Sequence, residues 1–197
     1  MNGAEPPPVV SVRDHNAIPP SGIWITLEGS NLGQSARNRS GRLRRSTQTA
    51  VLFSSDGEEV RYPARLRWVC VRCANSCRDI PPRKRNILLT PSDVERITRA
   101  TKLRAEEFSE TSVSHRPYER KMKKLGGSCM FLQGSRCSIY QARPLICRFY
   151  PFCLHPSEDG GLEVRFDRAC SGIGKGSIRS KMFFHKLVRL ARRELRT

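Results

Sequence analysis

Cys70-Val-Arg-Cys73-Ala-Asn-Ser-Cys77 places three thiols within eight residues of the chain. The first two cysteines form a C-x-x-C pair, and a tight turn over two intervening residues aims both sulfurs at one cation. Cys77 follows closely enough to reach the same site. Thiolates are soft ligands that select zinc, Cu(I) or iron–sulfur clusters. This stretch therefore predicts a fold organised around bound metal.

Five more cysteines follow at wider spacings. They form neither the second C-x-x-C of a zinc ribbon nor the closely spaced run of bacterial ferredoxins. The fold must therefore bring them together, and a metal-free chain is expected to be poorly folded because such a site belongs to the core. All eight cysteines are predicted metal ligands: Cys70, Cys73, Cys77, Cys129, Cys137, Cys147, Cys153 and Cys170.

Charge and cysteines divide the chain near residue 60. The 197 residues carry a net charge of +18, from 36 Lys or Arg and 18 Asp or Glu. Residues 1–60 hold 6 of each sign, so residues 61–197 carry the whole excess and all eight cysteines. The sequence has no apolar run of the roughly 18 residues that span a membrane, and it shows no secretory signal at its start. We expect a cytoplasmic, reducing environment, where cysteines serve metal binding or catalysis rather than disulfides.

Three parts are predicted. Residues 1–60 form a low-complexity, mostly disordered extension with strand-like pieces at 23–27 and 50–53. Residues 61–176 form the cysteine-cluster domain, and residues 177–197 a basic amphipathic helix. The fold class is α+β, small and mainly helical, with irregular metal-stabilised cysteine loops and a few short strands.

Two further elements have local signals. Thr90 suits a helix N-cap, Pro91 the first helical position and Asp93 the third, which predicts a helix over 91–102. Apolar and charged residues alternate over 162–167, which predicts a strand.

A family resemblance extends this reading. Residues 70–77 resemble the C-x-x-C-G-x-C-C opening of the YkgJ-like cysteine-cluster family. Residues 129–152 are similar to its block C-x-F-L…C-x-I-Y-x-x-R-P-x-x-C-R-x-x-P-F, and residues 89–97 resemble its L-T-x-x-D-x-x-R-I helix. Cys170 with the glycines after it resembles the last family cysteine. The resemblance spans about 66–176 and implies a zinc- or iron-chelating domain with eight cysteines.

The sequence departs from the family at Ser76, where the alignment expects a cysteine. Either the additional Cys153 replaces that ligand, or one site keeps an open coordination position that admits water or substrate. Arg143 and Arg148 bracket Cys147; they either offset the charge of a thiolate cluster or form ordinary salt bridges.

Three functions remain open. The first is an iron–sulfur protein, with for example a 4Fe-4S cluster, in redox chemistry or protein modification. Some family members resemble flagellin lysine N-methylases, but the chain has no G-x-G-x-x-G cofactor motif and no evident catalytic residues. The second is a zinc-stabilised basic module that binds nucleic acid or an acidic protein. The third is a structural metal domain that docks on a partner through its C-terminal helix.

Overall fold

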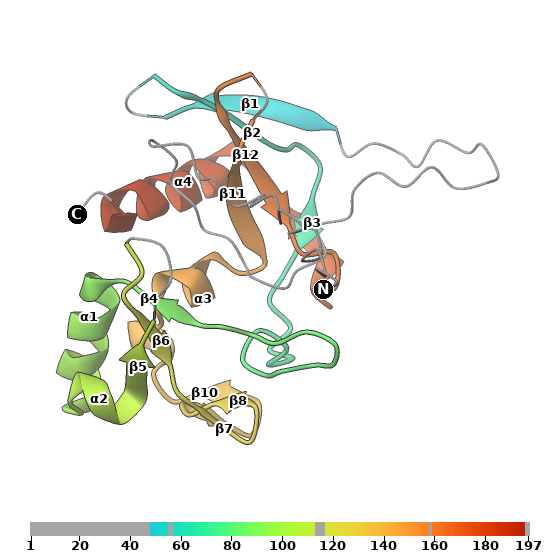
Figure 1. The fold of residues 1–197 in the computed structure, drawn as a ribbon. Helices are drawn as coiled ribbons and strands as arrows, with labels where there is room; N and C mark the ends of the chain where they lie inside the picture. The colour runs from blue at the N-terminus through green and yellow to red at the C-terminus, as the bar shows by residue number, and fades with distance from the viewer. Residues whose placement is uncertain (1–47, 55–56, 113–116, 158, 196–197) are drawn as a thin grey trace, which may run out of the picture.

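The computed structural model describes residues 48–54, 57–112, 117–157 and 159–195 (Figure 1). Within these ranges the chain forms thirteen strands, four α-helices and one short 3-10 helix. With 27% helix and 33% strand, the fold is rich in small sheets, and the prediction of a mainly helical fold is wrong. The strand-like piece expected at 23–27 and most of the predicted extension lie outside the described residues.

The main sheet has four strands in the order β1-β2-β12-β11. Neighbours pair antiparallel, except that β12 runs parallel to β2. The strands predicted at 50–53 and 162–167 are confirmed as β1 and β12. The bounds are β1 Thr49–Phe53, β2 Glu59–Pro63, β11 Phe152–Pro156 and β12 Leu162–Phe166.

Helix α4, Lys181–Leu195, packs on this sheet (Figure 1). Its fully buried Phe184 lies 4.9 Å from the ring of Tyr62 on β2 and 5.7 Å from Phe152 on β11, measured between ring centroids. The helix predicted over 177–197 begins four residues later than expected, because Ser177 and Ile178 belong to β13 (Ile173–Ile178). None of the helices in the described ranges is long and apolar enough to cross a membrane.

Helix α1, Pro91–Thr101, has the predicted N-terminus. The Thr90 hydroxyl accepts the Asp93 N–H, and the Asp93 carboxylate accepts the Thr90 N–H, each at 3.1 Å. This reciprocal capping box satisfies two backbone donors that a helix start leaves unpaired. The helix buries Ile97 completely, so one face is fixed against the core.

The cysteine region forms short paired strands where irregular loops were expected. Each pair spans two or three residues on at least one side, too short to show an alternating pattern, which explains the error in fold class. In the β7–β8 hairpin, Gly126 and Gly127 both have positive φ, as the two central residues of a tight hairpin turn require. The elements are β3 Arg67–Trp68, β4 Leu88–Leu89, α2 Ala105–Phe108, β5 Ser109–Thr111, β6 Arg120–Met122, β7 Lys124–Leu125, β8 Ser128–Cys129, β9 Leu132–Gln133, β10 Arg136–Cys137, η1 Tyr140–Ala142 and α3 Leu145–Phe149.

Candidate metal centre

A cavity of about 240 Å³ lies between the segment after β3, the short hairpins and helix α3. A buried water needs only about 10–15 Å³ of such space, so the cavity has room for more than one ion. Seven of the eight cysteines line it: Cys70, Cys73, Cys77, Cys129, Cys137, Cys147 and Cys170. The fold therefore gathers thiols that are up to 100 residues apart in sequence.

Four of these thiols lie close to one another. The Cys129 N–H donates to the Cys77 carbonyl at 2.8 Å, which joins the first cysteine stretch to the β7–β8 hairpin. Strand β10 supplies Cys137 beside β9, and helix α3 supplies Cys147. The charges of these groups act on one another's pKa. Cys77, Cys129, Cys137 and Cys147 are hereafter the four-thiol set.

Burial is the main influence on the pKa values of Cys129, Cys137 and Cys147. It raises the pKa of Cys129 to about 11, and it raises the pKa of Cys147 well above its ordinary value. Neighbouring thiolates raise both further. The pKa of Cys137 is also raised by burial, although the charge of Arg143 opposes this. Without metal these groups are protonated at neutral pH, so a bound cation must displace their protons.

The remaining lining thiols form a second group, hereafter the three-thiol set: Cys70, Cys73 and Cys170. The Val69 N–H donates to the Gly172 carbonyl at 3.3 Å, which brings the segments of Cys70 and Cys170 together. A Cβ on Gly172 would lie 2.1 Å from the Val69 carbonyl oxygen, so this approach requires glycine. Burial and then the charge of Asp167 raise the pKa of Tyr150, and Cys170 and Cys73 raise it further, which places the phenol near both thiols.

The buried carboxylate of Asp167 fixes the turn that precedes Cys170. It accepts from Arg85 at 2.9 Å, from the Ala169 N–H at 2.9 Å and from the Tyr150 hydroxyl at 3.4 Å. Burial alone would raise the pKa of Asp167, but the Arg85 guanidinium and the Ala169 N–H hold it below its ordinary value. Asp167 therefore remains an anion that orients this segment.

Cys153 lies apart from the other cysteines. It belongs to β11, is 1% exposed and does not contribute to the cavity lining. Burial raises the pKa of its thiol to about 12, and the charges that act on it are those of Arg165, Asp167 and Glu163. Ser76 lies in the lining, with its hydroxyl 3.6 Å from the Cys77 sulfur. The structure thus brings together seven of the predicted ligands and leaves Cys153 outside.

The donor set of the cavity fits a soft metal. All eight cysteines are free thiols, with no disulfide among them. In the described ranges, no three Cys, His, Asp or Glu side chains already converge on one point where an ion would sit. The thiols instead surround the cavity. Thiolate sulfur is the donor that zinc and iron–sulfur clusters select. Loading therefore requires the sulfurs to move inward around the bound metal.

The two arginines that bracket Cys147 have different roles. Arg143 lines the cavity and stacks on Tyr140, with its guanidinium carbon 3.5 Å from the ring centroid. Arg148 instead forms an ion pair with Glu194 of α4 at 3.2 Å. Both readings of the sequence thus apply, one to each residue. Arg72 and Arg136 join Arg143 in the lining, so three guanidinium groups accompany the thiols.

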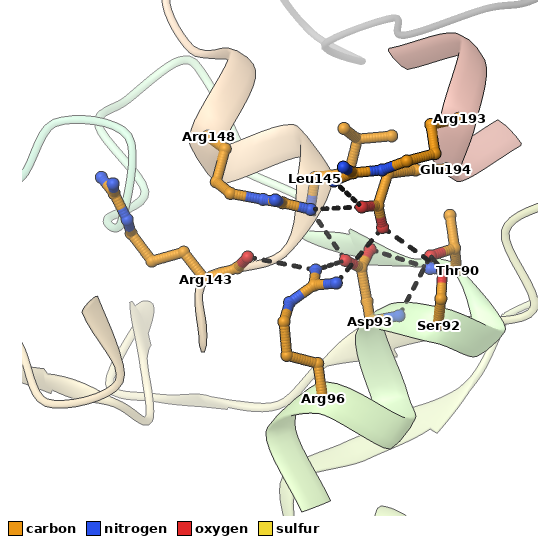
Figure 2. Close-up of polar contacts among 9 residues, drawn as sticks. All are labelled: Thr90, Ser92, Asp93, Arg96, Arg143, Leu145, Arg148, Arg193 and Glu194. Carbon is orange, nitrogen blue, oxygen red and sulfur yellow. Dashed lines mark hydrogen bonds and ion pairs between the residues drawn. The ribbon is translucent and has the colours of Figure 1, made fainter. Parts of the chain in front are cut away.

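A buried ionic network holds α3, the helix that carries Cys147 (Figure 2). The Asp93 carboxylate of α1 accepts the Leu145 N–H at the start of α3 at 2.9 Å. Arg96 pairs with Asp93 and reaches Glu194 at 3.2 Å. Glu194 also pairs with Arg148, as Figure 2 shows. The network therefore joins α1, α3 and α4 around two buried carboxylates.

The pKa values of the two carboxylates are shifted in opposite directions. Burial raises the pKa of Asp93. Burial alone would also raise the pKa of Glu194, but Arg193, Arg148 and Arg96 hold it below its ordinary value. Sequence reasoning identified Asp93 as a helix-start residue and missed its bond to α3. The network depends on contacts between residues up to about 100 positions apart in the sequence. Beyond the helix start, the sequence gives no signal for these contacts.

Comparison with known proteins assigns the class. Residues 69–171 match the CxxCxxCC family, which is described as a "putative zinc- or iron-chelating domain". This match covers half of the chain, and the chain belongs to that family. An uncharacterised protein of Methanocaldococcus jannaschii is 30% identical over 127 residues, which cover 60% of this chain and 65% of the archaeal protein. No solved structure matches.

Replacing Glu194 by Gln tests the network. The variant removes the carboxylate that Arg148 and Arg96 share, although Arg96 keeps Asp93. Its free energy of unfolding at pH 7 is expected to be about 1–3 kcal/mol lower than that of the wild type. A carboxylate with a lowered pKa stabilises the fold above its unfolded pKa and loses that effect as pH falls through its folded value. The difference between wild type and variant should therefore persist at pH 5 and shrink below about pH 4, as measured by denaturant unfolding.

Glu163→Gln is the matched control, because it breaks a half-exposed pair with Arg165 on β12. Its effect should stay within about 0.5 kcal/mol. Equal losses for the two variants would contradict a special role for the α4 carboxylate.

Proposed function

We propose that this protein chelates metal through the seven cysteines that line the cavity. The observation that carries the proposal is the convergence of those thiols, from five separate segments, on one cavity. The four-thiol set supplies the four soft donors that a closed zinc site or an iron–sulfur cluster requires. Cys153 is left out of the proposed ligands because it faces other groups.

An iron–sulfur cluster is favoured over a single zinc ion. The cavity is larger than one ion needs, and the guanidinium groups of Arg72, Arg136 and Arg143 offset the negative charge that a thiolate cluster carries. Such a cluster would supply one-electron chemistry, which makes a redox role the first candidate. Free thiols of this kind fit a reducing compartment such as the cytoplasm. Lysine methylation is supported only by the likeness to some family members, since the lining contributes no Asp, Glu or His from the described residues.

Single cysteine replacements test this ligand set. Cys77→Ser and Cys147→Ser each remove a donor from the four-thiol set and are expected to lose most of the metal bound there, because serine is a poor substitute for thiolate. Cys153→Ser is the matched control, a buried cysteine outside the cavity, and should retain the metal content of the wild type. The measurement is metal and acid-labile sulfide per chain after anaerobic purification.

Iron with matching sulfide in the wild type would support the cluster, and zinc without sulfide would support the closed zinc site. Loss of metal from Cys153→Ser with full occupancy in Cys77→Ser would contradict the assigned ligands.

An acidic partner is a second candidate, supported by the arginines in the lining. Arg72 and Arg136 are exposed beside the cavity. Phosphate binding by such groups releases counterions and gives an affinity that falls steeply with salt. Binding of duplex DNA should therefore weaken between 50 and 200 mM salt by about fortyfold if three phosphates are contacted, and by more if the number is larger. An affinity that does not change over this range would exclude nucleic acid as the partner.

A further inference from the structure

The two sets of lining thiols differ in how many coordination positions of a metal they can fill. The four-thiol set can fill all positions of a tetrahedral metal or all corners of a four-iron cluster from protein sulfur alone. The three-thiol set falls one donor short. Among the described residues that line the cavity, Asp, Glu and His are absent, so none can supply the usual fourth ligand. The only other cysteine, Cys153, lies outside the lining.

The polar groups nearest the three-thiol set are already engaged. The Tyr150 hydroxyl donates to Asp167 at 3.4 Å. The Asp167 carboxylate is occupied by Arg85, by Arg83 and by the Ala169 N–H, and it does not line the cavity. Recruiting either group to a metal would break a buried ion-pair network, which is costly. Neither group is therefore available as a fourth donor, and the described residues of the lining offer no other carboxylate or imidazole.

The segments that carry Cys70 and Cys170 are nonetheless held side by side. Strand β3 pairs with β13, and Trp68 lies opposite Ile173. Trp68 precedes Cys70 by two residues, and Ile173 follows Cys170 by three. The close approach of Val69 and Gly172 fixes the same junction. Cys70 is exposed, so the set reaches solvent. Three accessible thiols that line one cavity are what a metal site with an exchangeable ligand needs, once the sulfurs move inward around the metal.

We propose that the three-thiol set binds a metal whose remaining coordination position opens into the cavity and takes a small anionic ligand. This rests on the proposed metal chelation. The arginines of the lining, Arg72, Arg136 and Arg143, supply the positive charge that favours an anion there. Closed four-donor sites are typical of structural metals, and three protein donors with an open position are typical of reactive ones. The four-thiol set would then be closed to added ligands, and the three-thiol set would be open to them.

The test uses the full-length protein reconstituted anaerobically with Co²⁺, whose visible bands report its ligands, and titrated with azide. In the wild type, azide should shift the cobalt bands saturably with one azide bound per chain. Cys70→Ser should abolish that shift, because it removes a donor of the three-thiol set. Cys137→Ser is the matched control; it should lose cobalt from the four-thiol set and keep the azide shift.

Two results would overturn the inference alone: cobalt bands of the loaded wild type that do not respond to azide, or a response that survives in Cys70→Ser and disappears in Cys137→Ser. A wild type that binds no cobalt, iron or zinc would overturn the proposed function together with the inference. If Cys70→Ser fails to fold, Cys73→Ser takes its place, and loss of the azide shift in a variant that still binds cobalt is the expected result.

Discussion

The Asp93 carboxylate is the interaction on which the arrangement of the site depends. It closes the N-terminus of α1 through Thr90 and at the same time accepts the first N–H of α3 at Leu145. Helix α3 lies between α4 with its sheet and the smaller strands around α1 (Figure 1). Because Cys147 lies on this helix, one buried carboxylate sets the position of a proposed ligand relative to both halves of the fold. A buried charge of this kind is costly to leave unpaired, so its partners are tightly constrained.

Electrostatics connects this framework to metal binding. The buried thiols resist ionisation, as the raised pKa values of Cys129 and Cys147 show. A soft cation offsets that cost by replacing the protons, and the nearby guanidinium groups offset the negative charge that remains. If the cavity thiols are the ligands, metal binding and folding are coupled, because these residues lie on the hairpins, on α3 and on the segment after β3.

Local sequence signals predicted the elements that are long or capped. Thr90, Pro91 and Asp93 predicted the start of α1. The alternation of apolar and charged residues predicted β12, and the helical spacing of apolar residues predicted α4. The two-residue strands around the cysteines gave no such signal, because their stability comes from pairing with distant segments. This is why the fold was expected to be mainly helical.

The candidate site was likewise predicted only in part from the sequence. Spacing and family likeness identified the cysteines, but not their division into two sets, which depends on tertiary placement. Cys153 was included because it directly follows the second cysteine block and could replace the ligand missing at Ser76. On β11 its neighbours Phe152 and Leu154 are also buried, and strand alternation directs Cys153 to the opposite face from theirs. The sequence could not show whether that face met the cavity.

X-ray absorption at the edge of the metal in the purified, full-length protein tests the central claim most directly. If the cavity thiols hold the metal, the first shell is dominated by sulfur, at about 2.3 Å for zinc. A first shell dominated by nitrogen or oxygen donors at about 2.0–2.1 Å would contradict the account.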